Sequence, residues 1–167
     1  RMLARSAAAK TAAAPEWYEL KRKVCLLLAP HSFDHYMQYV EWNREPSRKF
    51  WVPRRSVLMG LCNDLQDLEE HRIKFLGVSM PPRVGKSTIC IFFLTWHMGR
   101  HPDDASAMGG HSDTLVNGFY GELNAVLDPD GEYLWHDVFP HAQIESRSAK
   151  YLQINLNHPK RFPTMTC

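Results

Sequence analysis

The stretch "VSMPPRVGKSTIC", residues 78–90, constrains the fold more than any other part of the sequence. It contains Gly-Lys-Ser, the last three residues of the phosphate-binding pattern G-x-x-x-x-G-K-[ST]. Met80 stands where that pattern has its first glycine, and Pro81, Pro82 and Arg83 follow it. We therefore expect a phosphate-binding loop with an unusual entry.

The segments on either side of the loop support this interpretation. Residues 73–79, "IKFLGVS", are short, apolar and partly β-branched, which is typical of a buried strand. Residues 86–100 are apolar on nearly all sides, as is a helix buried against a sheet. A strand before the loop and a buried helix after it are the setting that the motif requires. The alternative is an exposed Lys-Ser pair that begins an ordinary helix.

Each residue of the loop then has a predicted role. Gly85 allows the backbone to approach a phosphate, and amides at the start of the helix point at the anion. Lys86 bridges the β- and γ-phosphates, and the Ser87 hydroxyl coordinates Mg²⁺. Thr88 holds the α-phosphate side. With ATP and Mg²⁺ as cofactors, the predicted nucleotide-binding residues are Arg83, Val84, Gly85, Lys86, Ser87 and Thr88.

The entry to the loop is predicted to be rigid, because two consecutive prolines impose an extended backbone. Arg83 then lies beside the phosphates, where a guanidinium can sense the γ-phosphate or stabilise charge in the transition state. Arg83 and Lys86 are the predicted catalytic residues. The alternative for Arg83 is a salt bridge on the loop surface.

The rest of the chain predicts an α/β fold. With 167 residues, 44% hydrophobic and 23% charged, it suits one globular domain, and a net charge of +2 does not identify a partner. Helices are expected over residues 15–28, 31–45, 56–71 and 111–128, and further strands over 104–110, 150–156 and 161–167. Expected apolar stripes include Trp17, Leu20, Val24, Leu27 and Leu28 in the first helix, Phe33, Tyr36, Met37 and Val40 in the second, and Val57, Leu58, Leu61, Leu65 and Leu68 in the third.

The order of these elements favours a P-loop NTPase core, a parallel sheet flanked by helices. Residues 1–54 are predicted to form a helical subdomain with a basic connector, and residues 55–167 a partial P-loop domain.

At "MPPRVGKS" the sequence resembles the large terminase subunit of tailed bacteriophages, the ATPase that drives DNA into preformed heads. That family shows an arginine inside the loop and lacks the leading glycine. "ASAMGGHSDTLVNGFYGELNAVL" is similar to the strand and helix that follow the family's loop, and "NHPKRFPTMTC" to the segment before its next strand. The resemblance covers residues 55–167. It implies double-stranded DNA, a portal protein and a small terminase subunit as partners, assembly as a homo-oligomeric ring, and the cytoplasm of a bacterial host.

An ATPase of this kind also needs a strand that ends in paired acids, which hold Mg²⁺ and activate water. No run of four apolar residues ending in a pair of acids follows the loop, and no acidic nuclease cluster is evident. We therefore expect a chain that ends before the acidic strand, binds nucleotide and hydrolyses it poorly.

The basic connector, residues 44–55, suggests a second contact with the nucleotide. Its aromatic and arginine residues, Phe50, Trp51, Arg54 and Arg55, can sandwich an adenine or touch a DNA backbone, and Trp51 and Arg54 are the predicted adenine contacts. The alternative is a linker whose aromatic rings pack on the core, while the charges of Arg54 and Arg55 are solvated.

Other polar residues carry weaker predictions. The histidines near the loop, His97, His101 and His111, are expected to be solvated or core residues and not metal ligands. Ser112 or Asp113 is expected to cap a helix. Arginine fingers that reach a neighbouring subunit are conceivable at Arg100 and Arg147, but surface arginines look the same in sequence. The four scattered cysteines indicate reduced thiols, and the longest apolar run is too short to span a membrane.

Two other functions fit the loop. A small-molecule or nucleotide kinase would share it, although no lid-like arginine cluster follows. A non-catalytic interaction module with a degenerate loop is the third reading. Nucleotide binding separates the last from the other two.

Overall fold

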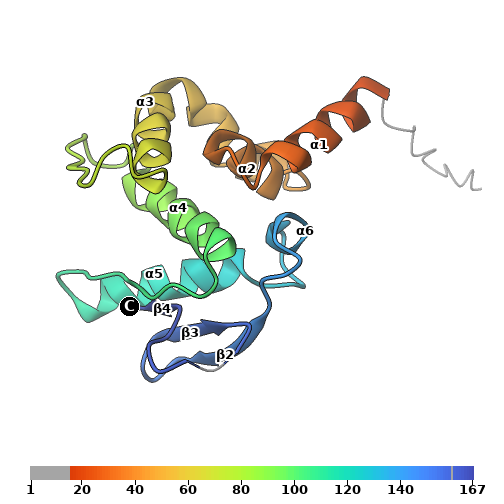
Figure 1. Cartoon of the computed structure of the whole chain (residues 1–167). Coiled ribbons are helices and arrows are strands. Elements are labelled where there is room, and N and C mark those ends of the chain that lie inside the picture. Colours follow the sequence, from red (N-terminus) through yellow and green to blue (C-terminus); the bar gives the residue numbers. More distant parts are fainter. Residues whose placement is uncertain (1–15, 159) are drawn as a thin grey trace, which may run out of the picture.

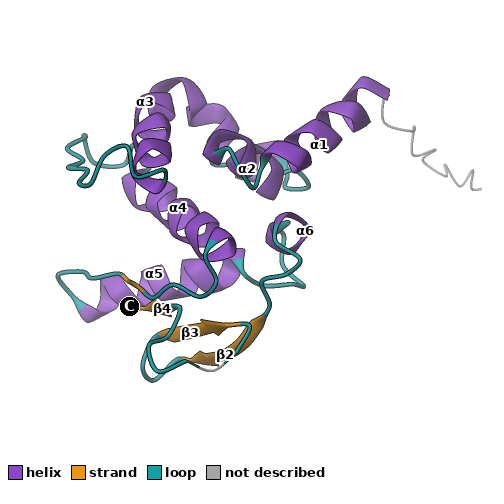
Figure 2. Ribbon diagram, in the orientation of Figure 1, coloured by secondary structure: helices purple, strands orange, loops and turns teal. Residues whose placement is uncertain are grey.

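The computed structural model describes residues 16–158 and 160–167 of the chain. It is a mixed α/β structure in which about half of the described residues are helical (Figures 1 and 2). The elements, in chain order, are α1 (Glu16–Leu28), α2 (Phe33–Val40), the 3₁₀ helix η1 (Pro46–Arg48), α3 (Trp51–Glu69), α4 (Lys86–Arg100), β1 (Ser106–Ala107), α5 (Asp113–Val126), α6 (Trp135–Val138), β2 (Ile144–Ser148), β3 (Gln153–Leu156) and β4 (Met165–Thr166).

The helices follow the local signals in the sequence closely. The apolar residues Phe33, Tyr36, Met37 and Val40 are all fully buried on α2. Ser32 caps this helix, since its side chain accepts a hydrogen bond from the His35 amide. Ser112 caps α5 in the same way through the Leu115 amide. Helix α4 has the predicted bounds.

The sheet differs from the parallel sheet that we expected. Its strand order is β1-β4-β3-β2, and only β1 and β4 run parallel, with Ser106 opposite Met165. Strands β3 and β4 are antiparallel, as are β2 and β3. The short turn between β2 and β3 permits only a hairpin, because a parallel pair needs a long crossover. The predicted strands at 104–110, 150–156 and 161–167 are confirmed as shorter strands.

The strand predicted directly before the loop does not form. Residues 73–79 belong to no helix or strand, and the Phe75 side chain is 93% exposed. Figure 1 shows this segment, between α3 and α4, projecting away from the sheet. A β-strand needs a neighbouring strand to bind its backbone amides and carbonyls, and the sheet of the described residues is built from other segments. The prediction of a buried strand here was wrong for that reason.

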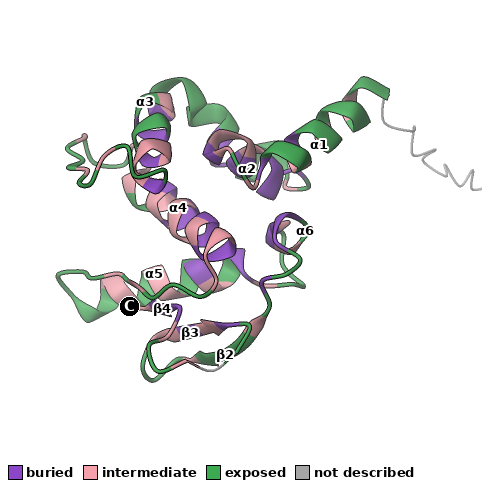
Figure 3. Ribbon diagram, viewed as in Figure 1, coloured by how far each residue is buried: buried purple, intermediate pink, exposed green. Residues whose placement is uncertain are grey.

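Two apolar stripes are less buried than their periodicity suggests. On α1, Trp17, Leu20 and Leu27 are 65%, 63% and 74% exposed, and Figure 3 shows the helix exposed along most of its length. On α3, Leu58, Leu61 and Leu65 are buried but Val57 is 67% exposed. Periodicity gives the apolar face of a helix, whereas burial also needs a partner for that face. The predicted helical subdomain includes residues 1–15, which lie outside the described part of the chain.

The core is aromatic and centres on α4. Thr95, in the middle of α4, joins two other helices by hydrogen bonds. Its Oγ1 lies 2.7 Å from the Tyr36 hydroxyl of α2, and its carbonyl accepts a 2.8 Å bond from the Trp135 indole of α6. The Trp96 indole donates to the Ala29 carbonyl at 2.9 Å. Helix α4 therefore lies among other helices, since it also packs on α3 and α5.

Helix α3 begins at Trp51, earlier than predicted, and takes in the second half of the basic connector. Pro53 is tolerated there because the first turn of a helix does not need its amide. The predicted domain boundary between residues 54 and 55 falls inside this helix, and the division into two domains stays a prediction. Of the helices within the described residues, none combines the length and the apolar character that crossing a membrane requires.

Candidate functional site

The loop between Pro81 and Gly85 contains two residues with a left-handed backbone. Gly85 precedes α4 as its N-cap and adopts a left-handed conformation with φ of 104°. Arg83 is also left-handed, with φ of 65°. Such alternation lets successive amides point to one side, toward the N-terminus of a helix, where an anion is favoured. Gly85 has no side chain to oppose this conformation.

Lys86 folds back across the loop. Its ammonium donates hydrogen bonds to the carbonyl oxygens of Met80 and Pro81, the second at 3.1 Å. The residue that replaces the usual first glycine therefore contributes its backbone carbonyl to the loop. The lysine is held over the turn by these two bonds, at the start of α4.

A hollow of about 300 Å³ opens beside the loop. Its lining residues are Phe50, Arg54, Arg83, Gly85, Lys86, Ser87 and Thr88. Three of them carry a positive charge, so the hollow favours an anionic ligand. Its size is at the lower end of the roughly 300–1,000 Å³ of small-molecule sites. Five of the six predicted nucleotide-binding residues are thus brought together, whereas Val84 is half-buried and is not among the lining residues.

Of the two predicted adenine contacts, Arg54 lines the hollow and Trp51 does not. The guanidinium of Arg54 lies 5.2 Å from the centre of the Phe50 ring. Trp51 is fully buried, and its indole donates a 2.8 Å hydrogen bond to Asp34. The aromatic side chain at the hollow is Phe50, the other aromatic residue of the connector, since the sequence does not show which of two adjacent rings faces the loop.

A buried carboxylate fixes this aromatic residue. Glu41 is 1% exposed and accepts hydrogen bonds of 2.8 Å from the amides of both Phe50 and Trp51. Arg44 donates to the same carboxylate at 2.8 Å. Glu41 thus binds the unpaired amides at the N-terminus of α3, as a capping residue does. It thereby holds Phe50 against the loop.

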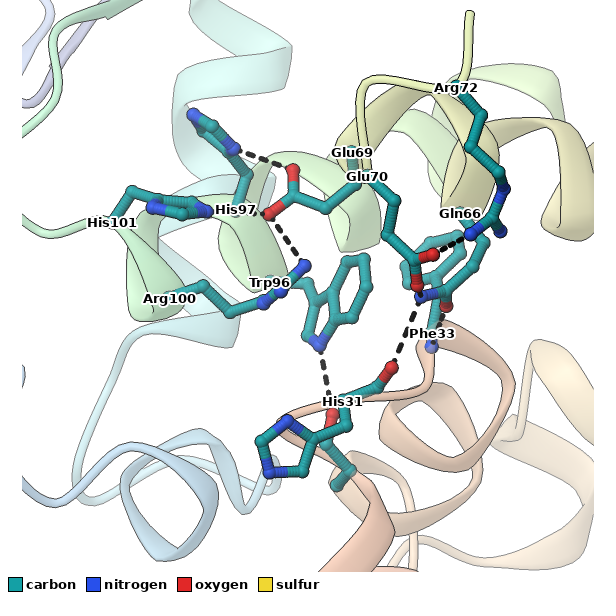
Figure 4. A network of polar contacts seen from close by, with 11 residues as sticks. His31, Phe33, Gln66, Glu69, Glu70, Arg72, Trp96, His97, Arg100 and His101 are labelled. Atoms are coloured by element: carbon teal, nitrogen blue, oxygen red, sulfur yellow. Dashed lines mark hydrogen bonds and ion pairs between the residues drawn. The ribbon is translucent and has the colours of Figure 1, made fainter.

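A second polar cluster lies at the other end of α4 (Figure 4). Glu69, the last residue of α3, has a side chain that is only 2% exposed. Its carboxylate lies 2.7 Å from His97 Nδ1 and 3.0 Å from His101 Nε2, and it accepts a 2.8 Å bond from Arg100. Burial raises the pKa of Glu69, but the hydrogen bond from His97 and the positive charges around the carboxyl outweigh it and hold that pKa below its ordinary value.

The histidines of this cluster are four residues apart at the end of α4, His97 in its last turn and His101 as its C-cap, and both reach the same carboxylate. We expected no metal ligation by these histidines, and the interval from His97 to His101 was the sequence signal that could have suggested such a site. Arg100, considered as an arginine finger, is engaged by Glu69 and lies 4.7 Å from the Trp96 ring centre. Arg147 donates to the Leu127 carbonyl at 3.0 Å.

The chain matches no model of a known protein family, no curated protein and no solved structure.

Proposed function

We propose that the loop binds the phosphates of ATP, and that the chain is the ATP-binding part of a DNA-packaging motor of the large terminase type. The observation that carries the nucleotide site is the loop itself. A left-handed Gly85 precedes a 15-residue helix, and the ammonium of Lys86 lies over the same turn. A basic hollow adjoins both. The resemblance of "MPPRVGKS" to the terminase loop supports the finer part of the proposal.

The residues present fit a triphosphate with Mg²⁺. Amides at the start of α4 would face the phosphates, and Lys86 would exchange its two carbonyl partners for phosphate oxygens. Ser87 is exposed beside the lysine and would supply a hydroxyl to Mg²⁺. Arg83 and Arg54 add two further charges from the walls of the hollow. The bound metal would supply charge neutralisation between the phosphates.

Phe50 gives the base a surface on which to stack. The Phe50 ring lines the hollow but is only 9% exposed, and the Arg54 guanidinium lies 5.2 Å from its centre, so the guanidinium would have to move aside for a base to stack on the ring. This arrangement replaces the predicted contact through Trp51. In the motor, hydrolysis would move an element that grips DNA phosphates, with the portal protein and small subunit as partners. We expect negligible turnover from this chain alone, because no paired acids follow an apolar run after the loop.

Nucleotide binding is the direct test of the proposal. We expect the untagged chain to bind fluorescently labelled Mg²⁺-ATP weakly but measurably by anisotropy. Lys86→Ala should weaken binding roughly 10–100-fold, the loss that follows from removing a charge-assisted hydrogen bond of about 1.5–3 kcal/mol. Lys150→Ala is the matched control, since Lys150 is an exposed lysine on the β2–β3 turn. It should bind as the unchanged chain does.

No measurable affinity for Mg²⁺-ATP, or an equal loss in both lysine variants, would contradict the nucleotide site and favour a non-catalytic module. The packaging role has a separate test. Double-stranded DNA should bind with an affinity that falls steeply with salt and shows no sequence preference. Nucleotide binding without any DNA binding would support the phosphate-binding loop and contradict the role in a packaging motor.

A further inference from the structure

The Glu69 cluster brings together the donor atoms of a metal site. Among the described residues, one group of three potential metal-ligating side chains, Glu69, His97 and His101, has donor atoms that all lie within 4.8 Å of one another. Two imidazole nitrogens and a carboxylate oxygen are ligands that suit Zn²⁺. Hard cations such as Mg²⁺ and Ca²⁺ prefer oxygen ligands alone.

The spacing is close to that of a four-coordinate ion. Bonds of about 2.0–2.1 Å to tetrahedral Zn²⁺ separate neighbouring ligand atoms by roughly 3.4 Å. The distances from the Glu69 oxygens to His97 Nδ1 and His101 Nε2 are 2.7 and 3.0 Å. Opening each contact by about half an ångström, through small rotations of the two rings, would admit the ion.

The surroundings fix the ligands and leave access to them. His97 comes from the last turn of α4, His101 is the C-cap of that helix, and the glutamate ends α3, so each backbone lies in or directly at the end of a helix. Arg100 holds Oε1 of the carboxylate, in the manner of a residue that orients a metal ligand. A hollow of about 350 Å³ adjoins all three donor side chains, which gives an ion an entry path and leaves room for water as a further ligand.

We propose that Glu69, His97 and His101 form a binding site for one Zn²⁺ ion, which joins the C-terminal ends of α3 and α4. The His–Glu hydrogen bonds then belong to the metal-free form, and Arg100 remains on the carboxylate in both forms. This site shares no residue with the phosphate-binding loop, because the two lie at opposite ends of α4. The competing explanation is a purely hydrogen-bonded cluster that binds no ion.

The test begins with the untagged, metal-free chain. Titration with Zn²⁺ against a chromophoric chelator should reveal one tight equivalent per chain, and added Zn²⁺ should raise the melting temperature. Substitution with Co²⁺ should give visible bands of a four-coordinate ion with nitrogen and oxygen ligands. His97→Ala and Glu69→Gln should each weaken Zn²⁺ binding by more than the roughly 10–100-fold that loss of a supporting residue costs.

His111→Ala is the matched control, because His111 is an exposed histidine outside the cluster. It should keep the affinity of the unchanged chain. Circular dichroism checks that each variant is folded, and the Co²⁺ spectrum of the unchanged chain gives a result even where a variant does not fold. Absence of a stoichiometric ion, an octahedral Co²⁺ spectrum, or full affinity in folded His97→Ala would overturn the site.

Discussion

Phe50 lies so close to Gly85 that a β-carbon on the glycine would be 2.5 Å from Cε2 of the ring. The glycine also has a φ of 104°, which other residues adopt only with strain. The first turn of α3 and the loop before α4 are therefore packed together at a point where no side chain fits. Two segments that lie 35 positions apart in sequence depend on each other for their conformation.

Gly85→Ala should accordingly destabilise the protein. The left-handed backbone alone costs about 1–2 kcal/mol for an alanine, and displacement of the Phe50 ring adds to it. Urea unfolding should show the loss as a lower midpoint. Gly118→Ala is the control: in α5 its β-carbon meets nothing within 4 Å, and an alanine in a helix interior should stabilise by about 0.5–1 kcal/mol. Equal effects of both substitutions would contradict the packing described.

Glu41→Ala should lower the unfolding free energy by about 2–3 kcal/mol, because it removes both a helix cap and the partner of buried amides. It should also weaken nucleotide binding, since the carboxylate holds Phe50 in place. Glu45→Ala, at an exposed acid in the next turn, should change stability by no more than about 0.5 kcal/mol. Urea titrations of both variants measure the difference, and a similar loss in each would argue against Glu41 as a cap.

Asp34 should contribute a pH-dependent part of the stability. Burial raises the pKa of Asp34, but hydrogen bonds from Arg55 and Trp51 outweigh it, so that pKa lies below the ordinary 3.8. The folded state therefore binds this proton less readily than the unfolded state does. The stabilisation is complete above the unfolded pKa and is lost as the pH falls through the lower, folded pKa.

The measurement compares the unchanged chain with Asp34→Asn between roughly pH 6 and pH 2, the window that spans the titration of an aspartate with a lowered pKa. The difference in unfolding free energy should be largest near pH 6 and should shrink below about pH 4. A difference that stays constant over this range would show that the charge of Asp34 does not contribute.

Cys62 should resist alkylation in the folded protein. It is 2% exposed, and burial raises the pKa of its thiol to about 12. At pH 8 only about one molecule in ten thousand would carry the thiolate, which is the reactive form. Mass spectrometry after brief treatment with iodoacetamide should find Cys62 unmodified, and labelled once urea unfolds the chain. Rapid modification without denaturant would show that α3 opens locally.

The parts of the fold that could be predicted are those specified by neighbouring residues. Ser32 and Ser112 mark helix starts, and apolar spacing gives α2, α4 and α5. Strand β2 was missed because "IESRS" is mostly exposed and has little apolar alternation. The strand at 73–79 was wrongly predicted, because an apolar run does not reveal whether another strand will pair with it.

The two candidate sites also differ in how much of each the sequence could predict. The loop is contiguous, so Gly85, Lys86 and Ser87 could be assigned from the motif alone. The Glu69 cluster depends on the packing of α3 against α4, which brings together residues 28 positions apart. Only the His97–His101 interval was visible in the sequence, and it is common on helices that bind no metal. Trp51 was predicted to contact adenine, but its neighbour Phe50 lines the hollow, and two adjacent aromatic residues cannot be distinguished by the sequence motif alone.

Helix α4 begins at Lys86 and ends at Arg100, so one rod about 20 Å long carries the loop at one end and the histidine pair at the other. Side chains from α2 and α6 hold the helix at Thr95 by hydrogen bonds. A rigid tilt of α4 about this point would move its C-terminal end, with His97, relative to Glu69 on α3. A spectroscopic probe of the two imidazoles would therefore register events at the loop without touching it.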